Sequence, residues 1–207
     1  MPNPPITRYS EARLPTPNGE FRVVVYRTGE DVKTGGTALG LGKEEHVAMV
    51  LGDVSGAAVL ARVHSSCFTG EVLGSLRCDC RAQLDAALER IGTEGRGVLV
   101  YLVQEGRGIG LGNKIAAYQL QDDGADTVDA NLALGLPADL RSYDLAAGIL
   151  RDLGVTSVRL MTNNPEKIAG LERAGMEVLT QESHWVGSTE HSAGYLAAKK
   201  SKLGHLS

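Results

Sequence analysis

The sequence predicts a single α/β domain, in which a mixed β-sheet with antiparallel N-terminal strands is flanked by helices in three layers. Three observations predict this fold class. Strand-like runs dominate the first quarter of the chain, a continuous apolar run at 97–103 follows a helical pattern, and a strand–helix–strand pattern at 157–179 is typical of a βαβ unit. We find no internal repeat and no biased linker, so residues 1–207 are expected to form one domain.

The first quarter of the chain is expected to be largely antiparallel. Three prolines among the first five residues predict a frayed start, flexible through residues 1–13. The turn sequence PTPNG precedes a predicted strand at 21–26, and a glycine-rich loop is expected at 29–43. Two further strands are predicted at 46–51 and 57–63, and the short GDVSG connection between them favours a hairpin.

From residue 81 onward the apolar residues repeat with the period of a helix. Leu84, Ala87, Leu88 and Ile91 fall on one face of a predicted helix that ends near Gly95. The run 97–103 then predicts a strand that is buried on both faces. The other expected elements are a short helix within 122–135, helices at 114–121, 142–153 and 167–174, strands at 157–161 and 176–179, and a short helix near 195–202 in a polar, flexible tail.

Composition and charge exclude some classes of function. The chain is 43% hydrophobic and 22% charged, as in ordinary globular domains. A net charge of −4 argues against a general nucleic-acid binder. No apolar run reaches the length of a membrane span, and the first residues carry no apolar signal segment. With cysteines that form no evident disulfide framework, these features predict a cytoplasmic protein without a membrane or nucleic-acid partner.

All three cysteines lie in one short stretch, at Cys67, Cys78 and Cys80. An odd number of thiols is poorly explained by closed disulfides. Thiolates favour zinc, and three protein ligands would leave the fourth tetrahedral position open to water, as in catalytic zinc sites. His64 could instead fill that position and make a closed, structural site. Spacing by itself leaves catalytic zinc, structural zinc and unmetallated thiols all open.

Polar residues follow three of the predicted strands, in the segments RVHSSC, QEGRG and TNNPEK. Each segment offers one cation, namely Arg62, Arg107 or Lys167. Three such strand ends beside a thiolate cluster are best explained by a phosphate-rich ligand with a polar heterocycle. The glycine-rich turn after the buried strand has neither the Rossmann nor the Walker spacing, but it predicts an anion-binding turn that carries Glu105, Arg107 and Lys114.

These segments also carry a family resemblance. RVHSSCFTG, SLRCDC, AQLDAAL, EGRGIGL, NKI, DTVDAN, DLRSYD and LMTNNPEK, in this order and spacing, closely resemble GTP cyclohydrolase II, the first enzyme of riboflavin synthesis. The resemblance runs from about residue 14 to 206. It implies hydrolysis of GTP to 2,5-diamino-6-ribosylamino-4(3H)-pyrimidinone 5′-phosphate, formate and pyrophosphate. It also implies a homodimer.

The resemblance assigns a role to each site residue. Cys67, Cys78 and Cys80 would hold a catalytic zinc ion, whose water would attack C8 of guanine. Gln83 and Glu105 have the chemistry to read the guanine edge. The implied GTP-binding residues are Arg62, Val63, His64, Ser65, Ser66, Gln83, Glu105, Gly106, Arg107, Thr127, Thr162 and Lys167.

The implied catalytic residues are Tyr118, Asp139 and Arg141. Tyr118 would assist proton transfer during removal of the formyl group. Asp139 would accept a proton and Arg141 would act as nucleophile towards the α-phosphate as pyrophosphate leaves. A guanidinium is a poor nucleophile while protonated, so Arg141 could instead stabilise charge on the transferring phosphoryl group. Mg²⁺ is expected on the triphosphate, because the chain clusters too few carboxylates to hold it alone.

The sequence departs from the family pattern at three positions. Ser66 stands where a glutamate is expected, and Gly108 and Gly112 stand where Asn and a larger apolar residue are usual. We expect the two glycines to loosen the turn. Two other functions stay open: an enzyme that stops at the ring-opened formamide, and a catalytically silent zinc protein that binds GTP.

Overall fold

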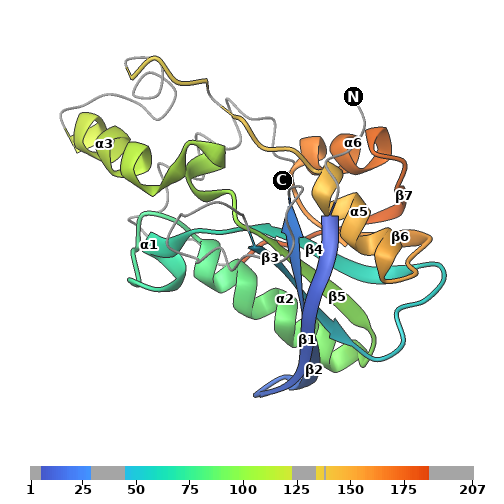
Figure 1. Ribbon diagram of the computed structural model, residues 1–207. Helices are drawn as coiled ribbons and strands as arrows, with labels where there is room; N and C mark the ends of the chain where they lie inside the picture. Colours follow the sequence, from blue (N-terminus) through green and yellow to red (C-terminus); the bar gives the residue numbers. More distant parts are fainter. Residues whose placement is uncertain (1–5, 29–44, 123–133, 138, 187–207) are drawn as a thin grey trace.

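The computed structural model describes residues 6–28, 45–122, 134–137 and 139–186. A seven-stranded mixed sheet runs through the molecule (Figure 1). Its strands are β1 (Ile6–Thr16), β2 (Gly19–Thr28), β3 (Glu45–Leu51), β4 (Val59–Ser65), β5 (Gly97–Leu102), β6 (Ser157–Met161) and β7 (Glu177–Glu182). The helical elements are α1 (Phe68–Glu71), α2 (Cys80–Glu94), the 3₁₀ turn η1 (Glu105–Gly108), α3 (Gly110–Asp122), α5 (Asp144–Asp152) and α6 (Pro165–Arg173).

The sheet has an antiparallel half and a parallel half. In the order β1-β2-β3-β5-β4-β6-β7, the pairs β1–β2, β2–β3 and β3–β5 are antiparallel. The pairs β5–β4, β4–β6 and β6–β7 are parallel. The predicted mixed α/β class with an antiparallel start is therefore confirmed.

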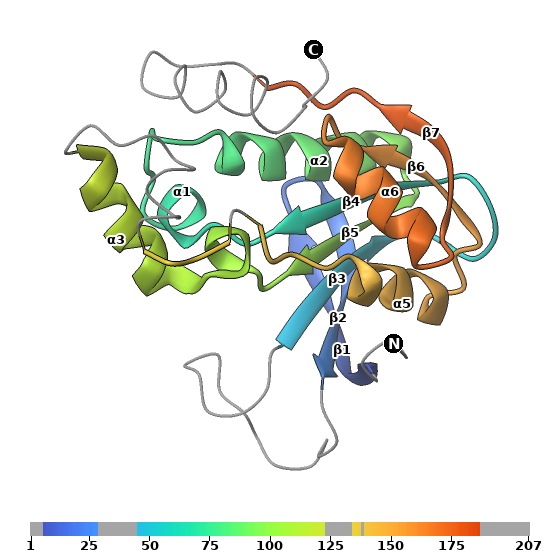
Figure 2. The same ribbon diagram turned by 90° about the horizontal axis from the view of Figure 1, so that it is seen from above.

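Helices cover both faces of the sheet, which gives the predicted three layers (Figure 2). On one face, α2 packs Ala87 and Ile91 against Phe21, Leu60 and Leu99. On the other face, α5 and α6 pack against the larger core cluster, which contains most of the buried valines of the sheet. No helix in the described segments is long and apolar enough to cross a membrane.

Most predicted elements are confirmed, with bounds shifted by a few residues at most. The helix predicted to end near Gly95 is α2, whose C-cap is Gly95. The doubly buried strand is β5, and the βαβ unit is β6–α6–β7. The predicted loop at 29–43 and the predicted helix near 195–202 lie outside the described residues. Of the short helix predicted within 122–135, residue 122 ends α3, residues 134 and 135 form a turn, and residues 123–133 lie outside the described residues.

The predicted hairpin between 46–51 and 57–63 is wrong. The strands β3 and β4 exist, but β5 lies between them. Helix α2 connects β4 to β5, so these two strands form a βαβ unit and pair in parallel, while β3 takes the other edge of β5. Six of the seven residues of β4 are buried, as expected for a central strand between β5 and β6.

The predicted frayed start is also wrong from Ile6 onward. Residues 6–16 form β1, which pairs with β2 from Ile6–Thr28 to Thr16–Gly19. The two-residue turn Pro17–Asn18 closes this hairpin. The prolines that predicted fraying are residues 2, 4 and 5, before β1, and the largely polar segment that follows them forms an edge strand, which tolerates Pro15 and needs little apolar burial.

Candidate active site

The four parallel strands deliver their carboxyl ends to one edge of the sheet, where ligands bind in open α/β folds. The residues that follow β4, β5, β6 and β7 line a cleft that opens to solvent. Sequence segments that lie more than a hundred residues apart therefore share one cavity. Its lining contains both charged and apolar side chains, as ligand-binding clefts commonly do.

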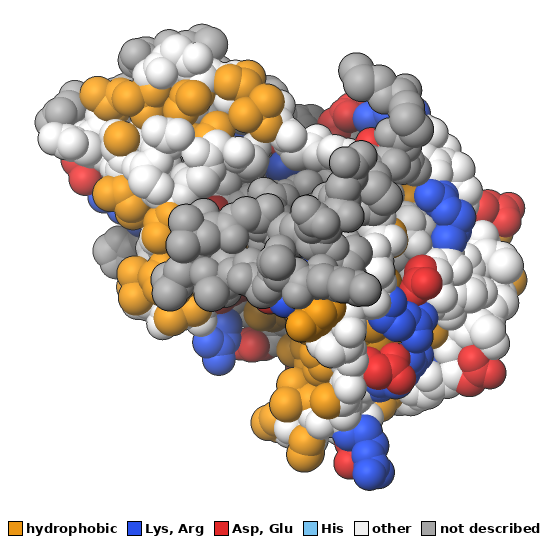
Figure 3. Space-filling view, viewed as in Figure 1, with side chains coloured by type: hydrophobic (Ala, Val, Ile, Leu, Met, Phe, Trp, Pro, Cys, Tyr) orange, Lys and Arg blue, Asp and Glu red, His pale blue; other side chains and the backbone are white. Residues whose placement is uncertain are grey.

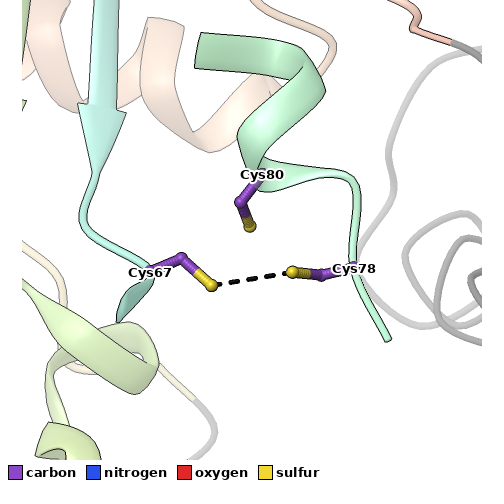
Figure 4. Close-up of side chains that lie close together, drawn as sticks. All are labelled: Cys67, Cys78 and Cys80. Atoms are coloured by element: carbon purple, nitrogen blue, oxygen red, sulfur yellow. Dashed lines mark hydrogen bonds between the residues drawn. The ribbon is translucent and has the colours of Figure 1, made fainter. Parts of the chain in front are cut away.

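The three cysteine sulfurs lie together in this cleft (Figure 4). Cys67 follows β4, Cys80 is the first residue of α2, and Cys78 lies in the loop between them. The Sγ atoms of Cys67 and Cys78 are 3.6 Å apart, and all three sulfurs lie within 4.8 Å of one another. Two sulfurs bound tetrahedrally to zinc at ~2.3 Å would be about 3.8 Å apart. We call these residues the sulfur cluster.

The backbone beside the sulfur cluster approaches closely enough to require glycine. A Cβ atom on Gly70 would lie 2.7 Å from Sγ of Cys78 and 3.3 Å from Sγ of Cys67. Only a residue without a side chain leaves the sulfurs free to converge. The donor set and the space around it therefore fit a thiolate-bound metal such as zinc.

His64 does not join the sulfur cluster. Its Nε2 is hydrogen-bonded to Oε1 of Glu71 at 2.8 Å, and Tyr101 donates its hydroxyl to the other carboxylate oxygen. Burial lowers the pKa of His64 below its ordinary value despite this carboxylate. Within the described segments, no histidine or carboxylate is grouped with the three sulfurs, which does not support the closed, structural reading.

Negative charge in the sulfur cluster concentrates on Cys67. Hydrogen bonds from Cys78 and Cys80 lower the pKa of Cys67. The same interactions with Cys67 raise the pKa values of Cys78 and Cys80. The metal-free cluster therefore holds its first thiolate at Cys67, the sulfur closest to a lysine.

That lysine is Lys114 on α3. Its Nζ lies 3.1 Å from Sγ of Cys67 and 2.7 Å from Oε1 of Glu105. Burial opposes the lysine charge, but the hydrogen bond to Glu105 and the charge of Cys67 outweigh it and raise the pKa of Lys114. Glu105 also accepts hydrogen bonds from the backbone N–H groups of Phe68, at 2.6 Å, and Gly106, at 2.9 Å.

A second buried cation lies on the floor of the cleft. Arg62 donates to the carbonyl of Met161 at 2.7 Å and to Oε1 of Gln83 at 2.6 Å. Burial lowers the pKa of Arg62 to about 10. Gln83 in turn donates to Asp79 at 2.6 Å, and its backbone carbonyl bonds to Nε2 of His184 at 2.8 Å. The amide of Gln83 is thus held in one orientation, while one N–H of its amide group remains for a ligand.

The segment after β6 presents a third buried cation. Lys167 donates its Nζ to the carbonyl of Val63 at 2.7 Å. It lies in the first turn of α6, which Asn164 caps by accepting from the backbone N–H of Glu166 at 3.0 Å. Thr162 accepts from the N–H of Asn164 at 3.0 Å, so the TNNPEK segment is fixed locally.

Asp139 and Arg141 form a bidentate ion pair just ahead of α5. Nε of Arg141 lies 2.9 Å from Oδ1 of Asp139, and Nη2 lies 2.5 Å from Oδ2. Burial alone would raise the pKa of Asp139, but the hydrogen bonds and charge of Arg141 outweigh it and lower that pKa. The N–H of Leu140 donates to the carbonyl of Arg107 at 3.0 Å, which joins the Asp139–Arg141 pair to η1.

The contact at Leu140 explains one of the unusual glycines. Gly108 has a φ of +90°, and a Cβ atom built there would lie 2.9 Å from Cβ of Leu140. The missing side chain allows the segment with the Asp139–Arg141 pair to dock closely on η1. By contrast, a Cβ on Gly112 would meet no atom within 4 Å. The sequence indicated a looser turn but not this packing.

Tyr118 lies on α3, one helical turn beyond Lys114, and lines the cleft. The guanidinium carbon of Arg77 is 4.8 Å from the centre of its ring, and Nζ of Lys114 is 5.7 Å away. Burial raises the pKa of Tyr118 above its ordinary value. Its hydroxyl is therefore protonated at neutral pH and can donate a hydrogen bond.

The cleft brings together most of the predicted site residues. Those that line it are Arg62, His64, Ser65, Ser66, Cys67, Cys78, Cys80, Gln83, Glu105, Gly106, Arg107, Tyr118, Arg141, Thr162 and Lys167. Asp139 is outside the lining but bonds to Arg141. Val63 has a buried side chain and reaches the site only through its carbonyl, and Thr127 lies outside the described residues.

The sequence did not single out several residues of the lining, notably Gln104, Asn163, His184 and Trp185. Asn163 stands inside the quoted TNNPEK segment and could have been found there. His184 and Trp185 follow β7, so the rule that parallel strands end at one edge could have found them once β7 was recognised. Burial lowers the pKa of His184 to about 4.

Comparison with known proteins gives a consistent family assignment. The sequence signature described as GTP cyclohydrolase II matches residues 7–183. The riboflavin biosynthesis protein RibBA of Bacillus mycoides is 52% identical over 202 residues, which cover 97% of this chain and 48% of the relative. RibBA of Mycobacteroides abscessus is 51% identical over 206 residues, covering 97% and 47%.

The chain therefore spans about half the length of these curated relatives. Among solved structures, RibBX of A. baumannii, a two-domain 3,4-dihydroxy-2-butanone 4-phosphate synthase, matches with a TM-score of 0.45 and 22% identity, over 88% of this chain and 40% of that one.

Proposed function

Because the chain belongs to the GTP cyclohydrolase II family, we propose that it hydrolyses GTP and opens the imidazole ring of the guanine. The proposed products are 2,5-diamino-6-ribosylamino-4(3H)-pyrimidinone 5′-phosphate, formate and pyrophosphate, as in the first step of riboflavin synthesis. One observation carries this proposal. Three sulfurs converge at the wall of the cleft that the strand ends form, with no fourth protein ligand grouped with them among the described residues.

We propose that Cys67, Cys78 and Cys80 hold one zinc ion. A zinc ion bound there supplies Lewis acidity and activates water near neutral pH. The chain contributes the orientation of the sulfurs, which are set by the end of β4 and the start of α2. Gly70 contributes the open space in which the sulfurs converge.

The proposed nucleotide contacts follow from the free hydrogen-bonding capacity in the cleft. Gln83 keeps one amide N–H for the base. Lys114, Phe68 and Gly106 occupy three of the roughly four acceptor sites of Glu105, which leaves about one site for the base. Arg107 and Arg141 line the cleft as cations suited to phosphate. Mg²⁺ is proposed to arrive with the triphosphate, since hydrated magnesium commonly binds through phosphates.

The geometry of the Asp139–Arg141 pair bears on its proposed role. Both carboxylate oxygens of Asp139 face the guanidinium of Arg141, and the pKa of Asp139 is lowered. An ionised partner holds the proton on Arg141, which disfavours nucleophilic attack by its nitrogen. The pair is therefore better suited to stabilise charge on the transferring phosphoryl group as pyrophosphate leaves. Tyr118 is proposed to donate the proton during removal of the formyl group.

The test is incubation of the full chain with GTP, MgCl₂ and ZnSO₄. Formate and pyrophosphate are measured separately, and the pyrimidine is identified by mass. Equal amounts of both products with the deformylated pyrimidine are expected. Consumption of GTP without formate would show an enzyme that stops at the formamide. GTP binding without release of either product would show the silent zinc protein and refute the proposed reaction.

Three further properties are proposed from family membership. The whole chain, residues 1–207, forms one family domain, and it works in the cytoplasm as a homodimer.

Hydrophobic side chains gather over α1 and α3 (Figure 3), where Val72, Leu73 and Ile115 are 66%, 66% and 48% exposed. Exposed apolar patches of this kind mark interaction surfaces. Light scattering after size-exclusion chromatography tests the dimer, and a monomeric mass at micromolar concentration would contradict it.

A further inference from the structure

Lys114 contacts Cys67, which is 47 residues away in sequence, and also lies close to Glu105 and Tyr118 in its own part of the chain. Its Nζ contacts Sγ of Cys67 at 3.1 Å and Oε1 of Glu105 at 2.7 Å, and it lies 5.7 Å from the ring centre of Tyr118. Its side chain is only 13% exposed, and that of Glu105 is 12% exposed. A buried lysine with these neighbours has few alternative positions for its charge.

Glu105 extends the reach of this lysine to the backbone beside the metal ligand. While Oε1 binds Lys114, Oε2 accepts the N–H of Phe68 at 2.6 Å. Phe68 is the residue after Cys67 and begins α1. Lys114 and Glu105 thus hold Cys67 from two sides, through its sulfur and through the next peptide group.

The negative charge expected of a metal bound by three thiolates explains why a lysine would lie beside the sulfur cluster. Three thiolates and one divalent cation sum to a net charge of minus one, which is costly in a partly buried cleft. The ammonium of Lys114 offsets this charge at the sulfur that it contacts, and the carboxylate of Glu105 is the second anion in contact with the same ammonium. A hydrogen bond from an ammonium to a thiolate also restricts the sulfur to one direction, as the outer partners of metal ligands commonly do.

We propose that Lys114 is a positioning residue for the metal centre: it places a positive charge against the thiolate of Cys67, orients that sulfur and, through Glu105, fixes the start of α1. This inference deepens the proposed function, because it rests on zinc binding at the sulfur cluster. It assigns to Lys114 a contact with the metal ligand rather than with the nucleotide phosphates, which the sequence pattern of an anion-binding turn had suggested.

The test measures zinc affinity without substrate. Wild type, Lys114→Met and Lys114→Arg are titrated with zinc against a chromophoric chelator. Removal of an outer partner typically lowers metal affinity about 10- to 100-fold, and we expect this loss for Lys114→Met. Lys114→Arg keeps the charge and should recover most of the affinity. Arg173→Met removes an exposed ion pair with Glu166 on α6 and should bind zinc like wild type.

A purely structural lysine would give a different pattern. Melting temperatures are therefore measured with and without zinc. For Lys114→Met we expect the gain in melting temperature on adding zinc to shrink, whereas a structural role would lower both forms equally. Zinc affinity within twofold of wild type in Lys114→Met would overturn the inference.

The outcomes separate this inference from the proposed reaction. A wild-type chain that binds zinc but releases no formate would refute the reaction, and the Lys114 result would still stand. Equal zinc affinity in wild type and Lys114→Met would refute the role of Lys114 and leave the reaction intact. Absence of zinc binding in wild type would refute both.

Discussion

Two parts of the site are held in place in different ways: the sulfur cluster, called the sulfur end below, and the Asp139–Arg141 pair, called the other end. The sulfur cluster lies between the end of a central strand and the start of α2, and Lys114 and Glu105 connect it to a third element. The Asp139–Arg141 pair lies in irregular chain ahead of α5, where the side chain of Asp139 is 35% exposed. The side-chain hydrogen bonds described for the pair join Asp139 to Arg141, and the backbone N–H of Leu140 connects the pair to η1.

This difference predicts separate roles for the two parts, metal binding at the sulfur cluster and phosphate chemistry at the Asp139–Arg141 pair. A metal site must be built to within a fraction of an ångström before the ion arrives, so its ligands belong on rigid elements with buried partners. The proposed triphosphate site needs less rigid ligands, because the phosphate anion can compete with Asp139 for Arg141 when it binds. Changes at the sulfur end should therefore remove the metal, and changes at the other end should leave the metal in place and affect phosphate chemistry.

The largest effect is expected from Cys78→Ser. Loss of one of three sulfurs should release zinc and lower formate production by about a thousandfold or more, because several kcal/mol of transition-state stabilisation depend on the ion. Zinc content is measured by atomic absorption beside a formate assay. If the metal-assayed variant made formate at the wild-type rate, the sulfur end would have no catalytic role.

Arg141→Ala should have the next largest effect. Pyrophosphate release should fall by about a thousandfold, the scale on which an arginine stabilises phosphoryl transfer, while zinc content stays at one ion per chain. Arg13→Ala is the control, since the side chain of Arg13 on β1 is 83% exposed and forms an ion pair with Glu20 rather than with a residue of the cleft. Loss of zinc in Arg141→Ala would break the distinction between the two ends, and normal pyrophosphate release would leave Arg141 without a function.

Acid should destabilise the folded protein through His184, whose ring bonds to the backbone carbonyl of Gln83 on α2. Its pKa is about 4 in the folded protein and about 6.5 when unfolded, so the unfolded chain binds more protons between these values. Stability is then fully present above pH 6.5 and falls as the pH drops towards 4, by up to about 3 kcal/mol. Urea unfolding of wild type and His184→Gln across this range measures the difference. Parallel pH profiles for the two proteins would show that His184 contributes nothing.

The smallest effect is expected from Gly108→Ala. A Cβ atom would meet Leu140 at a backbone φ of +90°, which should cost about 1–3 kcal/mol and slow pyrophosphate release more than zinc binding. Gly112→Ala is the matched control, because it adds a methyl group to α3 in open space and should be neutral or stabilising by up to about 1 kcal/mol. Equal behaviour of the two variants would show that the contact with Leu140 has no role.

Several parts of the site could be predicted from local sequence. The short spacing of Cys67, Cys78 and Cys80 allowed their sulfurs to share one cation, and the structure brings the three sulfurs together. RVHSSC, QEGRG and TNNPEK were predicted to share one ligand because each follows a strand and offers a cation, and residues of all three line the cleft. These predictions needed only residue types, short spacings and strand direction.

The side-chain partners could not be predicted in the same way. Arg62 was expected at the phosphates, yet its guanidinium is buried under Gln83 and the carbonyl of Met161. His64 was weighed as a metal ligand, but Glu71 binds it. Each outcome depends on which oxygen comes within 3 Å after packing, and chemically equivalent partners are spread along the whole chain.

The sequence by itself determined the fold class, most helices and strands, and the grouping of the three thiols, because caps, apolar periods and short spacings act over a few residues. Only the tertiary structure decided that β5 separates β3 from β4, that residues 6–16 form an edge strand, and that Lys114 contacts Cys67. The physical reason is range: strand order and charge pairing are chosen by contacts between residues far apart in the chain, where many alternatives have similar local energies.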